Sequence, residues 1–456
     1  MNKIVSFLFF TLGMYASANV HLPAIFADHM VLQRNATVNI WGHAEPNEEI
    51  TLTADFLDRE YKVKANSEAK FSIAFPTSKE GGPYTIKIKG YNEVILKDVL
   101  LGEVWLMSGQ SNMEMSAAWG IQNGEEEASK AQEPNIRFFK VNKSSADFPQ
   151  QEIVGNWSVC TPETMKQHSA VGYFFAQRLH KMLDGVPVAI IISAWGGTAA
   201  ELWTPEQVFI ENPDLKESFQ KFPPSKYYPI KTAAAYNAMI APINSYKIAG
   251  AAWYQGETNT GNFTTYEKLL TEMIASWRTA RQEEFPFYII QIAPYSYWED
   301  SGARIRNIQR KVAQKTPKSG LVMTSDVSTS DDIHPKNKKP VGERLANLVL
   351  KNEYGKHLGL VNAPTPERVV FEGQKAVVFL QNAEGLHFKN SSSPQFELAG
   401  IDGKYYPAKA VIKNNTIEIK SAQVKQPISV RYAWKNTAMP DIFNQVQLPL
   451  TTFEVK

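Results

Sequence analysis

An apolar run changes into a polar motif at residues 103–113, which read EVWLMSGQSNM. The first six residues are typical of a buried strand, and Ser111 follows with Gly109 two positions before it. A serine at this place exposes its hydroxyl at the edge of a sheet, and a helix that begins there favours developing negative charge. An N-cap role is equally consistent with Ser111. The stretch is not the nucleophile elbow of α/β-hydrolases, because Met113 stands where that motif needs its second glycine.

Similar apolar runs recur along the chain and alternate with helical patterns. The runs span residues 187–193, 248–254, 285–293 and 320–325, and helices are expected over 171–182, 266–277 and 342–350. Buried strands that alternate with helices predict a parallel α/β sheet covered on both faces. The chemistry of such sheets gathers at the carboxyl ends of the strands.

The two ends of the chain read as short strands instead. Period-two alternation marks residues 37–41, 49–53 and 84–89 before the α/β region, and residues 368–371, 376–380, 416–419 and 428–432 after it. Turn-forming clusters separate these stretches, so each end predicts a β-sandwich. The predicted domains are an N-terminal β-sandwich over 19–100, a catalytic α/β domain over 101–357 and a C-terminal β-sandwich over 358–456.

The N-terminus has the pattern of a signal peptide over residues 1–18. Lys3 supplies positive charge, residues 4–14 are apolar, and Ala16-Ser17-Ala18 fits a cleavage site. A buried first strand is the alternative interpretation. The apolar stretch is too short to span a bilayer, so no membrane anchor is expected. The pattern predicts export, either to the periplasm or out of the cell.

The composition excludes some classes of function. The chain has 456 residues, of which 43% are hydrophobic, and this argues for packed domains rather than disorder. Its 48 Lys and Arg residues against 46 Asp and Glu residues leave a net charge of +2, so nucleic acid is not an expected partner. The single cysteine, Cys160, has no base beside it and reads as a small buried filler.

A serine nucleophile needs a base, and His334 is the best placed of the eight histidines. It lies in the string SDDIHPKN, residues 330–337, soon after the fifth apolar run. An acid three residues before a histidine can hold the imidazole tautomer, which is the position of Asp331. Asp332, two residues before, competes for that role. The alternative interpretation is a helix start in which an aspartate is the cap.

Two further strand ends carry groups suited to an oxyanion hole. Gly196 and Gly197 follow the second run, and paired glycines let backbone N–H groups approach a substrate oxygen. Gln255 and Asn259 follow the third run and carry side-chain amides that can donate to the same oxygen. An ordinary turn also uses glycine, so the argument depends on several such strand ends in one parallel sheet.

These motifs resemble the sialate O-acetylesterase family, within the SGNH hydrolase superfamily. The resemblance is carried by four strings in the family's order: GQSNM at 109–113, WGGT at 195–198, WYQGE at 253–257 and DIHP at 332–335. It covers residues 102–355 and implies an SGNH-hydrolase-like parallel sheet flanked by helices. The flanking β-domains are also what the family's bacterial members imply.

By position, the resemblance implies that Ser111 is the nucleophile and His334 the general base. The backbone N–H groups of Ser111 and of Gly196 or Gly197 would donate to the oxyanion. The implied reaction is acyl transfer through an acetyl-enzyme, which water then hydrolyses. It needs no cofactor and no metal.

Two assignments stay open within the resemblance. Gln255 is the favoured third oxyanion donor because it directly follows the strand, and Asn259 is the alternative, since the superfamily's Gly-x-Asn-Asp block is replaced here. The superfamily's acid lies three residues before the histidine, which selects Asp331, whereas Asp332 belongs to the DIHP string itself. A Ser–His dyad assisted by a backbone carbonyl is a further alternative.

The substrate implied by the resemblance is an O-acetylated sugar, with sialic acid as the first expectation. Trp195 and Glu257 are the predicted substrate contacts, and Trp119, Trp203 and Trp253 are further aromatic residues for stacking or for the core. Acetylxylan or another acetylated polysaccharide is the alternative substrate. A non-catalytic carbohydrate-binding protein is disfavoured by the intact motifs around the serine and histidine, and a metal-dependent deacetylase by the lack of a metal-ligand motif.

Overall fold

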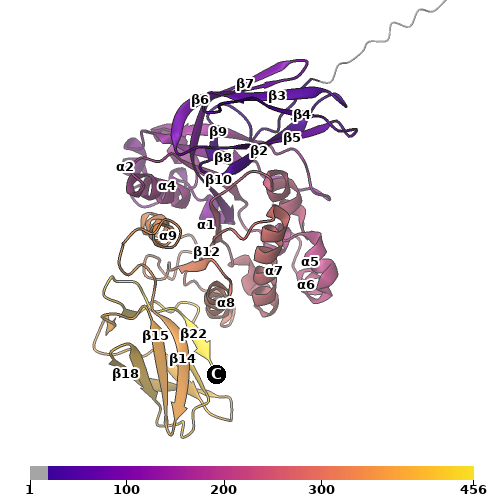
Figure 1. The fold of residues 1–456 in the computed structure, drawn as a ribbon. Helices are drawn as coiled ribbons and strands as arrows, with labels where there is room; N and C mark the ends of the chain where they lie inside the picture. The colour runs from indigo at the N-terminus through magenta and orange to yellow at the C-terminus, as the bar shows by residue number, and fades with distance from the viewer. Residues whose placement is uncertain (1–18) are drawn as a thin grey trace, which may run out of the picture.

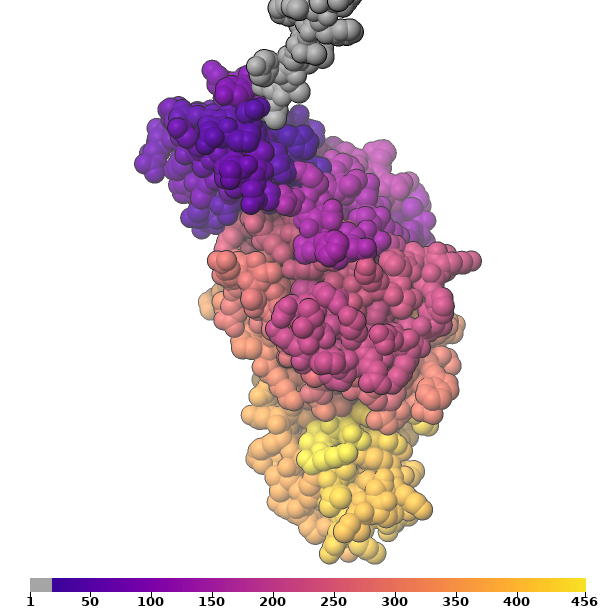
Figure 2. All heavy atoms as spheres, turned by 90° about the vertical axis from the view of Figure 1, so that its right-hand side faces the viewer, coloured from indigo at the N-terminus to yellow at the C-terminus, as the bar shows by residue number. Residues whose placement is uncertain are grey.

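The computed structural model describes residues 19–456. Figure 1 shows the N-terminal strands, a helix-flanked central region and the C-terminal strands in that order along the molecule. Figure 2 shows the two strand regions at opposite ends of an elongated shape. The predicted signal peptide, residues 1–18, lies outside the described residues.

One sheet of eleven strands forms the centre of the molecule. Seven of its strands lie in the order β13 (Ser319–Val322), β12 (Phe287–Ile290), β11 (Gly250–Tyr254), β7 (Glu93–Gly109), β10 (Val188–Ala194), β8 (Glu133–Val141) and β9 (Gly155–Cys160). Neighbours in this order are parallel, except that β8 and β9 are antiparallel. The five predicted runs correspond to β7 and to β10 through β13. A sheet of parallel strands flanked by helices is therefore confirmed, and β8 and β9 are additions to the prediction.

The central strand β7 is buried on both faces. Val104 and Leu106 belong to one hydrophobic core, whereas Trp105 and Met107 belong to the other. This alternation follows from the period of two in a strand, and it requires a cover on each side. Each face therefore needs its own helices.

Four long helices supply these covers. Helices α4 (Ala170–Met182) and α9 (Lys339–Asn352) contribute to the core around Trp105, and α7 (Phe263–Arg281) and α8 (Ser301–Lys315) contribute to the core around Leu106. Gly342 permits the close contact of α9 with α4, because a Cβ atom there would lie 2.7 Å from the Val171 carbonyl oxygen. The predicted helices lie within α4, α7 and α9.

Helix α8 was not predicted, and its composition gives the reason. Its buried residues include the polar side chains of Arg306, Asn307, Gln309 and Arg310. Arg306 donates to the carbonyl oxygens of Lys435 and Asn436, at 2.8 and 3.0 Å. Ile305, Ile308 and Val312 do recur at helical spacing, but polar residues make this helix much less apolar than α4 or α7. Its polar inner face anchors the C-terminal strands.

Part of the N-terminal region is continuous with the central sheet. Strand β7 runs unbroken from Glu93 to Gly109, pairing first with β6 and β1 and then with β10 and β11. The predicted boundary between residues 100 and 101 thus falls inside one strand, and no linker separates an independent N-terminal sandwich. The strands of this region are β1 (Val31–Gln33), β2 (Thr37–His43), β3 (Glu49–Ala54), β4 (Tyr61–Lys64), β5 (Lys70–Pro76) and β6 (Gly81–Lys89). Strands β1, β3, β4 and β6 belong to the central sheet, whereas β2 and β5 pair with each other in a separate two-stranded sheet.

The C-terminal region contains a further sheet of seven strands and a two-stranded one. Strand β18 (Tyr405–Lys413) joins the two halves of the larger sheet: its first half pairs with β17 (Phe396–Ala399) and its second half with β19 (Thr416–Lys420). Side chains from both halves share one hydrophobic core. The other strands are β14 (Thr365–Glu372), β15 (Lys375–Gln381), β16 (His387–Phe388), β20 (Ser429–Tyr432), β21 (Ile442–Phe443) and β22 (Phe453–Val455).

Short helices fill the connections of the central region. They are α1 (Ser111–Glu114), η1 (Ala117–Trp119), α2 (Gly124–Ser129), α3 (Pro162–Gln167), η2 (Ala200–Trp203), α5 (Glu206–Glu211), α6 (Pro213–Phe219), η3 (Tyr236–Ile240), η4 (Ala241–Ile243) and η5 (Thr258–Asn262). The first of them begins at the predicted nucleophile.

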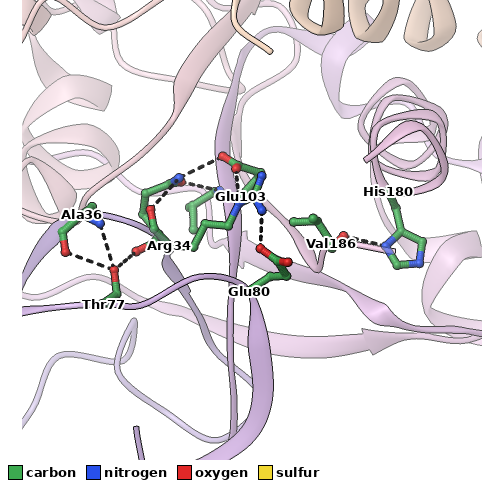
Figure 3. Close-up of polar contacts among 9 residues, drawn as sticks. Arg34, Ala36, Thr77, Glu80, Glu103, His180 and Val186 are labelled. Atoms are coloured by element: carbon green, nitrogen blue, oxygen red, sulfur yellow. Dashed lines mark hydrogen bonds and ion pairs between the residues drawn. The ribbon is translucent and has the colours of Figure 1, made fainter. Parts of the chain in front are cut away.

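A buried ion pair fastens the N-terminal strands to β7. Figure 3 shows Arg34 between the carboxylates of Glu103 and Glu80. The Nε atom of Arg34 lies 2.6 Å from Oε1 of Glu103, and Gln33 donates to the other oxygen of Glu103 at 2.9 Å. The side chain of Glu103 is only 5% exposed, so its charge depends on these partners.

The change Arg34→Met should therefore lower the free energy of unfolding by about 3 kcal/mol, because it leaves the Glu103 carboxylate buried without its cation. Denaturant unfolding of the full chain measures this. The matched change Lys62→Met, in the exposed pair of Lys62 with Glu60, should alter stability little. Equal effects of the two changes would contradict this account of the junction.

Candidate active site

The register of the central sheet brings three motifs to one edge. Gly109, at the end of β7, is paired with Ala194 at the end of β10 and with Tyr254 at the end of β11. The segments that follow these strands therefore start level with one another. The loop that carries His334 follows β13, the outermost parallel strand.

Gly109 allows the chain to turn from β7 into α1. Its φ angle is +133°, and a Cβ atom at this position would lie 2.2 Å from the Tyr254 carbonyl oxygen. That oxygen instead accepts a hydrogen bond from the N–H of Gln110, at 3.0 Å. Ser111 is then the first residue of α1, with its hydroxyl beyond the strand end.

The predicted nucleophile and base are in direct contact. His334 Nε2 lies 2.8 Å from Ser111 Oγ, which is hydrogen-bond distance. Both side chains are partly exposed, so a substrate can reach them. This is the geometry in which an imidazole takes the proton of an attacking hydroxyl.

The two candidate acids lie differently. Asp332 Oδ1 accepts a hydrogen bond from the backbone N–H of His334, at 2.8 Å. Asp331 is exposed, and a hydrogen bond with Thr329 lowers the pKa of its carboxyl group. Across residues 19–456, no ion pair or hydrogen bond joins the imidazole ring of His334 to a carboxylate. Asp332 thus shapes the loop, and the geometry is that of a Ser–His dyad.

The electrostatic environment favours a neutral imidazole. Burial lowers the pKa of His334, the positive charge of Lys338 lowers it further, and Asp332 opposes the shift. A general base must be unprotonated to act, so a lowered pKa widens the pH range in which His334 is competent.

Backbone donors lie beside the nucleophile. A Cβ atom on Gly196 would lie 3.3 Å from Ser111 Cβ, which places this glycine next to the reacting hydroxyl. The N–H of Gly196 already donates to Glu114 Oε2, at 3.1 Å. No hydrogen bond engages the N–H of Ser111 or of Gly197 within the described part of the chain. These two N–H groups are therefore available to donate to an oxyanion. The hydrogen bond between Glu114 and Gly196 was not predicted from the sequence.

The two predicted amide donors, Gln255 and Asn259, donate to buried protein groups instead of pointing to the Ser111 hydroxyl. Gln255 is fully buried, and its Nε2 donates to the Thr198 carbonyl at 3.2 Å and to Asn259 Oδ1 at 2.6 Å. Asn259 is also fully buried and donates to Glu201 Oε2 at 2.9 Å, while its oxygen accepts from the N–H of Ala200. Both side-chain amides are thus hydrogen-bonded to the backbone of the segment after β10, at Thr198 and Ala200.

The two predicted substrate contacts, Glu257 and Trp195, differ in their exposure to solvent. Glu257 is 5% exposed and accepts from Asn112 Nδ2 at 2.6 Å, so it lies under the site. Trp195 is partly exposed and packs edge-on against Tyr228, with ring centroids 6.4 Å apart. Trp203 and Trp253 are buried in the core, whereas Trp119 is 49% exposed. Of these four tryptophans and Glu257, only Trp195 borders the loop of Gly196 and Gly197, which is called the glycine loop below.

Two other residues with reactive side chains, His180 and Cys160, are not part of the site. His180 donates to or accepts from no group of the site, and its Nδ1 lies 2.6 Å from the Val186 carbonyl oxygen (Figure 3). Cys160 is buried, and burial raises the pKa of its thiol to about 12. A thiol with that pKa is a poor nucleophile at neutral pH.

The sequence model of one protein family, described as carbohydrate esterase, sialic acid-specific acetylesterase, matches residues 101–351. The chain belongs to this family. It is thus a carboxylic ester hydrolase, and the family predicted from the motifs is confirmed.

Individual relatives extend the likeness to nearly the whole chain. Sialate O-acetylesterase from Pongo abelii is 27% identical over 465 residues, covering 92% of this chain and 88% of that protein. The enzyme of the same name from Homo sapiens is 26% identical, with the same coverage of 92% and 88%. The solved structure of a carbohydrate acetylesterase from Xanthomonas citri superposes with a TM-score of 0.86 at 32% identity, covering 96% of this chain and 99% of that one.

As the predicted base, His334 sets the expected pH dependence of this esterase through its lowered pKa. The acidic limb of kcat/KM should fall below pH 6.5, the ordinary pKa of histidine, because the base loses activity only when the pH drops through its own lowered pKa. Initial rates on a chromogenic acetyl ester across pH measure the limb. A limb above pH 7 would show that His334 is not the base or that its surroundings differ.

The two acids can be separated by alanine substitution, which removes the acceptor oxygen that an asparagine would keep. Asp332→Ala should lower kcat more than Asp331→Ala, because only Asp332 accepts a hydrogen bond from the backbone of the predicted base. A misplacement of a catalytic group by about 1 Å can cost up to ~10²-fold, which bounds the expected effect of Asp332→Ala. If Asp331→Ala is the more damaging change, Asp331 acts on His334 in a way that this geometry does not contain.

Proposed function

We propose that this protein removes O-acetyl groups from sugars, foremost from sialic acids, with Ser111 as nucleophile and His334 as general base. The observation that carries the proposal is the hydrogen bond of 2.8 Å between these two side chains at the carboxyl edge of the sheet. The family and the sialate O-acetylesterases among its relatives support the choice of substrate.

The reaction proceeds in two steps. His334 takes the Ser111 proton as Oγ attacks the acetyl carbonyl, and the imidazolium then protonates the leaving sugar oxygen. In the second step His334 activates a water molecule, which releases acetate and restores the serine. The N–H groups of Ser111 and Gly197 stabilise the oxyanion of each tetrahedral intermediate.

The sugar has a place beside the acyl site. A cavity of about 600 Å³ is lined by Tyr228, Phe222 and Thr258, among others. It adjoins the glycine loop, because the Thr258 hydroxyl donates to the Gly197 carbonyl at 2.8 Å and a Cβ atom on Gly197 would lie 3.4 Å from the Tyr228 ring. Aromatic faces with polar neighbours are suited to a sugar ring.

The choice of sugar is tested with two substrates. Purified protein should release acetate from 9-O-acetylated sialic acid faster than from acetylated xylan fragments at equal ester concentration. Faster acetate release from the xylan fragments would contradict sialic acid as the preferred substrate and indicate a plant polysaccharide instead. The proposed serine mechanism would be unaffected by that result.

Export belongs to the proposal as well. The N-terminal pattern of positive charge, apolar run and small residues supports a periplasmic or secreted protein. Within the described residues, no helix is long and apolar enough to cross a membrane. Cell fractionation of a tagged full-length protein tests the location, and cytoplasmic protein of full length would contradict it.

Ser111→Ala should reduce deacetylation by ~10⁴-fold or more with the fold unchanged, because no other group takes over the nucleophile's role. Initial rates and thermal unfolding are the measurements. Ser129→Ala removes an exposed hydroxyl that bonds only to the Glu126 carbonyl, and serves as the matched control. A tenth of the wild-type rate in Ser111→Ala would exclude this serine as nucleophile.

Tyr228→Ala should raise KM for an acetylated sugar by ~10-fold and leave kcat/KM for a chromogenic acetyl ester nearly unchanged, because one aromatic contact contributes about 1 kcal/mol beyond its burial. Tyr91→Ala, at a 69% exposed position in the N-terminal region, is the control. An equal loss on both substrates would mean that Tyr228 supports the glycine loop rather than the sugar.

A further inference from the structure

A buried amide connects the two halves of the catalytic pair. Asn112 follows Ser111 in the chain, and its Nδ2 donates to the Ile333 carbonyl oxygen at 2.9 Å. Ile333 immediately precedes His334. The side chain of Asn112 has no exposed surface, so this bond is shielded from water. One hydrogen bond thus spans from the helix of the nucleophile to the loop of the base.

Two buried titratable side chains contact the same amide. Asn112 Oδ1 accepts from Lys338 Nζ at 2.5 Å, and Nδ2 also donates to Glu257 Oε1 at 2.6 Å. Lys338 is 1% exposed and Glu257 is 5% exposed. Buried polar groups need hydrogen-bond partners, so the three side chains depend on one another.

The groups that face Lys338 come from several elements. Its Nζ lies 5.2 Å from the centre of the Tyr254 ring, and Glu257 and Asp332 act on it with negative charge. Burial lowers the pKa of Lys338 to about 7. Lys338 in turn lowers the pKa of His334, as described above.

We infer that Lys338 is a positioning residue for the Ser111–His334 pair: it holds the loop of the base against the helix of the nucleophile through Asn112. The inference rests on the proposed function. No carboxylate holds the His334 ring among residues 19–456, and this buried network anchors the base in its place.

Lys338→Met in the full-length protein is the main test. On a chromogenic acetyl ester, kcat should fall ~10- to 100-fold with KM nearly unchanged, since a displaced base affects the transition state more than binding. The acidic limb of kcat/KM should move to higher pH, because removal of a positive charge raises the pKa of His334. Lys339→Met, beside it and paired with Glu127 at the surface, should leave both rate and limb as they are.

Asn112→Ser is the second variant, and it decides the matter if Lys338→Met does not fold. It cuts the bridge to the Ile333 carbonyl and should lower kcat at least ~10-fold, again with KM retained. Wild-type kcat and an unmoved limb in a folded Lys338→Met protein, or wild-type kcat in Asn112→Ser, would overturn the inference. Full activity in Ser111→Ala would instead overturn the proposed function, so the two failures are distinguishable.

A second, independent observation concerns His21, His43 and Glu152. The two histidines face each other across an antiparallel bridge, with backbone N–H to carbonyl distances of 2.9 Å in both directions. Side chains of such a pair project from the same face. Glu152 Oε1 lies 3.8 Å from His21 Nδ1 and 3.7 Å from His43 Nδ1.

The three ligand atoms converge, with Glu152 at ion-pair distance from each histidine. All lie within 4.8 Å of one another, beyond hydrogen-bond distance for the two pairs with Glu152. Zinc binds nitrogen and oxygen ligands at about 2.0–2.2 Å, so two ligands of one ion lie at most ~4.3 Å apart. His21 and Glu152 are exposed and His43 is half-buried, so these side chains have room to rotate toward a shared ion.

We propose that these residues bind one divalent transition-metal ion, such as zinc, as a structural clasp between the N-terminal strands and the segment that carries Glu152. Zinc titrated into chelator-treated full-length protein should bind at one site and raise the unfolding temperature, with deacetylation unchanged. His43→Ala should weaken this binding ~10-fold or more, whereas His29→Ala, which removes an exposed partner of Asp98, should not. Equal zinc affinity in wild type and His43→Ala would overturn the site.

Discussion

The hydrogen bond between His334 Nε2 and Ser111 Oγ is the contact on which the site depends, because it joins residues that lie 223 positions apart in the chain. Neither side chain can hold this distance of 2.8 Å by itself. The serine is fixed by the turn at Gly109, which only a glycine can make against the Tyr254 carbonyl. The histidine is fixed by its loop, through Asp332 and through the buried Asn112. The parallel sheet brings these supports to one edge.

The contact between the two residues of the proposed catalytic pair was predictable from the sequence. Ser111 and His334 each follow an apolar strand, and strand ends in a parallel sheet meet at one edge whatever the details of packing. Strands with continuous apolar runs, such as β10, were found for the same reason. Strand β8 was not predicted, because Arg137 interrupts its apolar pattern. Arg137 is nevertheless buried, and its charge is paired with Asp98. Helix α8 was not predicted, because polar residues dominate it even on its buried face.

The supporting groups were not predictable, since sequence position does not fix the direction of a side chain. Gln255 does follow its strand, but its amide is used beneath the glycine loop, where the Thr198 carbonyl needs a donor. Lys338 lies in the string KNKKP, which reads as a solvated, positively charged segment, yet it is buried against Asn112. In both cases a long-range hydrogen bond decides the role, and no local pattern encodes it.

The claim that Ser111 forms a covalent intermediate has a direct measurement. Protein turning over a chromogenic acetyl ester is quenched with acid within the first turnovers, digested and analysed by peptide mass spectrometry. The account predicts an acetyl group on Ser111, which disappears once the substrate is exhausted. An acetyl group on a different residue that appears and decays with turnover, or acetate release with no acetylated peptide under conditions that trap known acyl-enzymes, would contradict it.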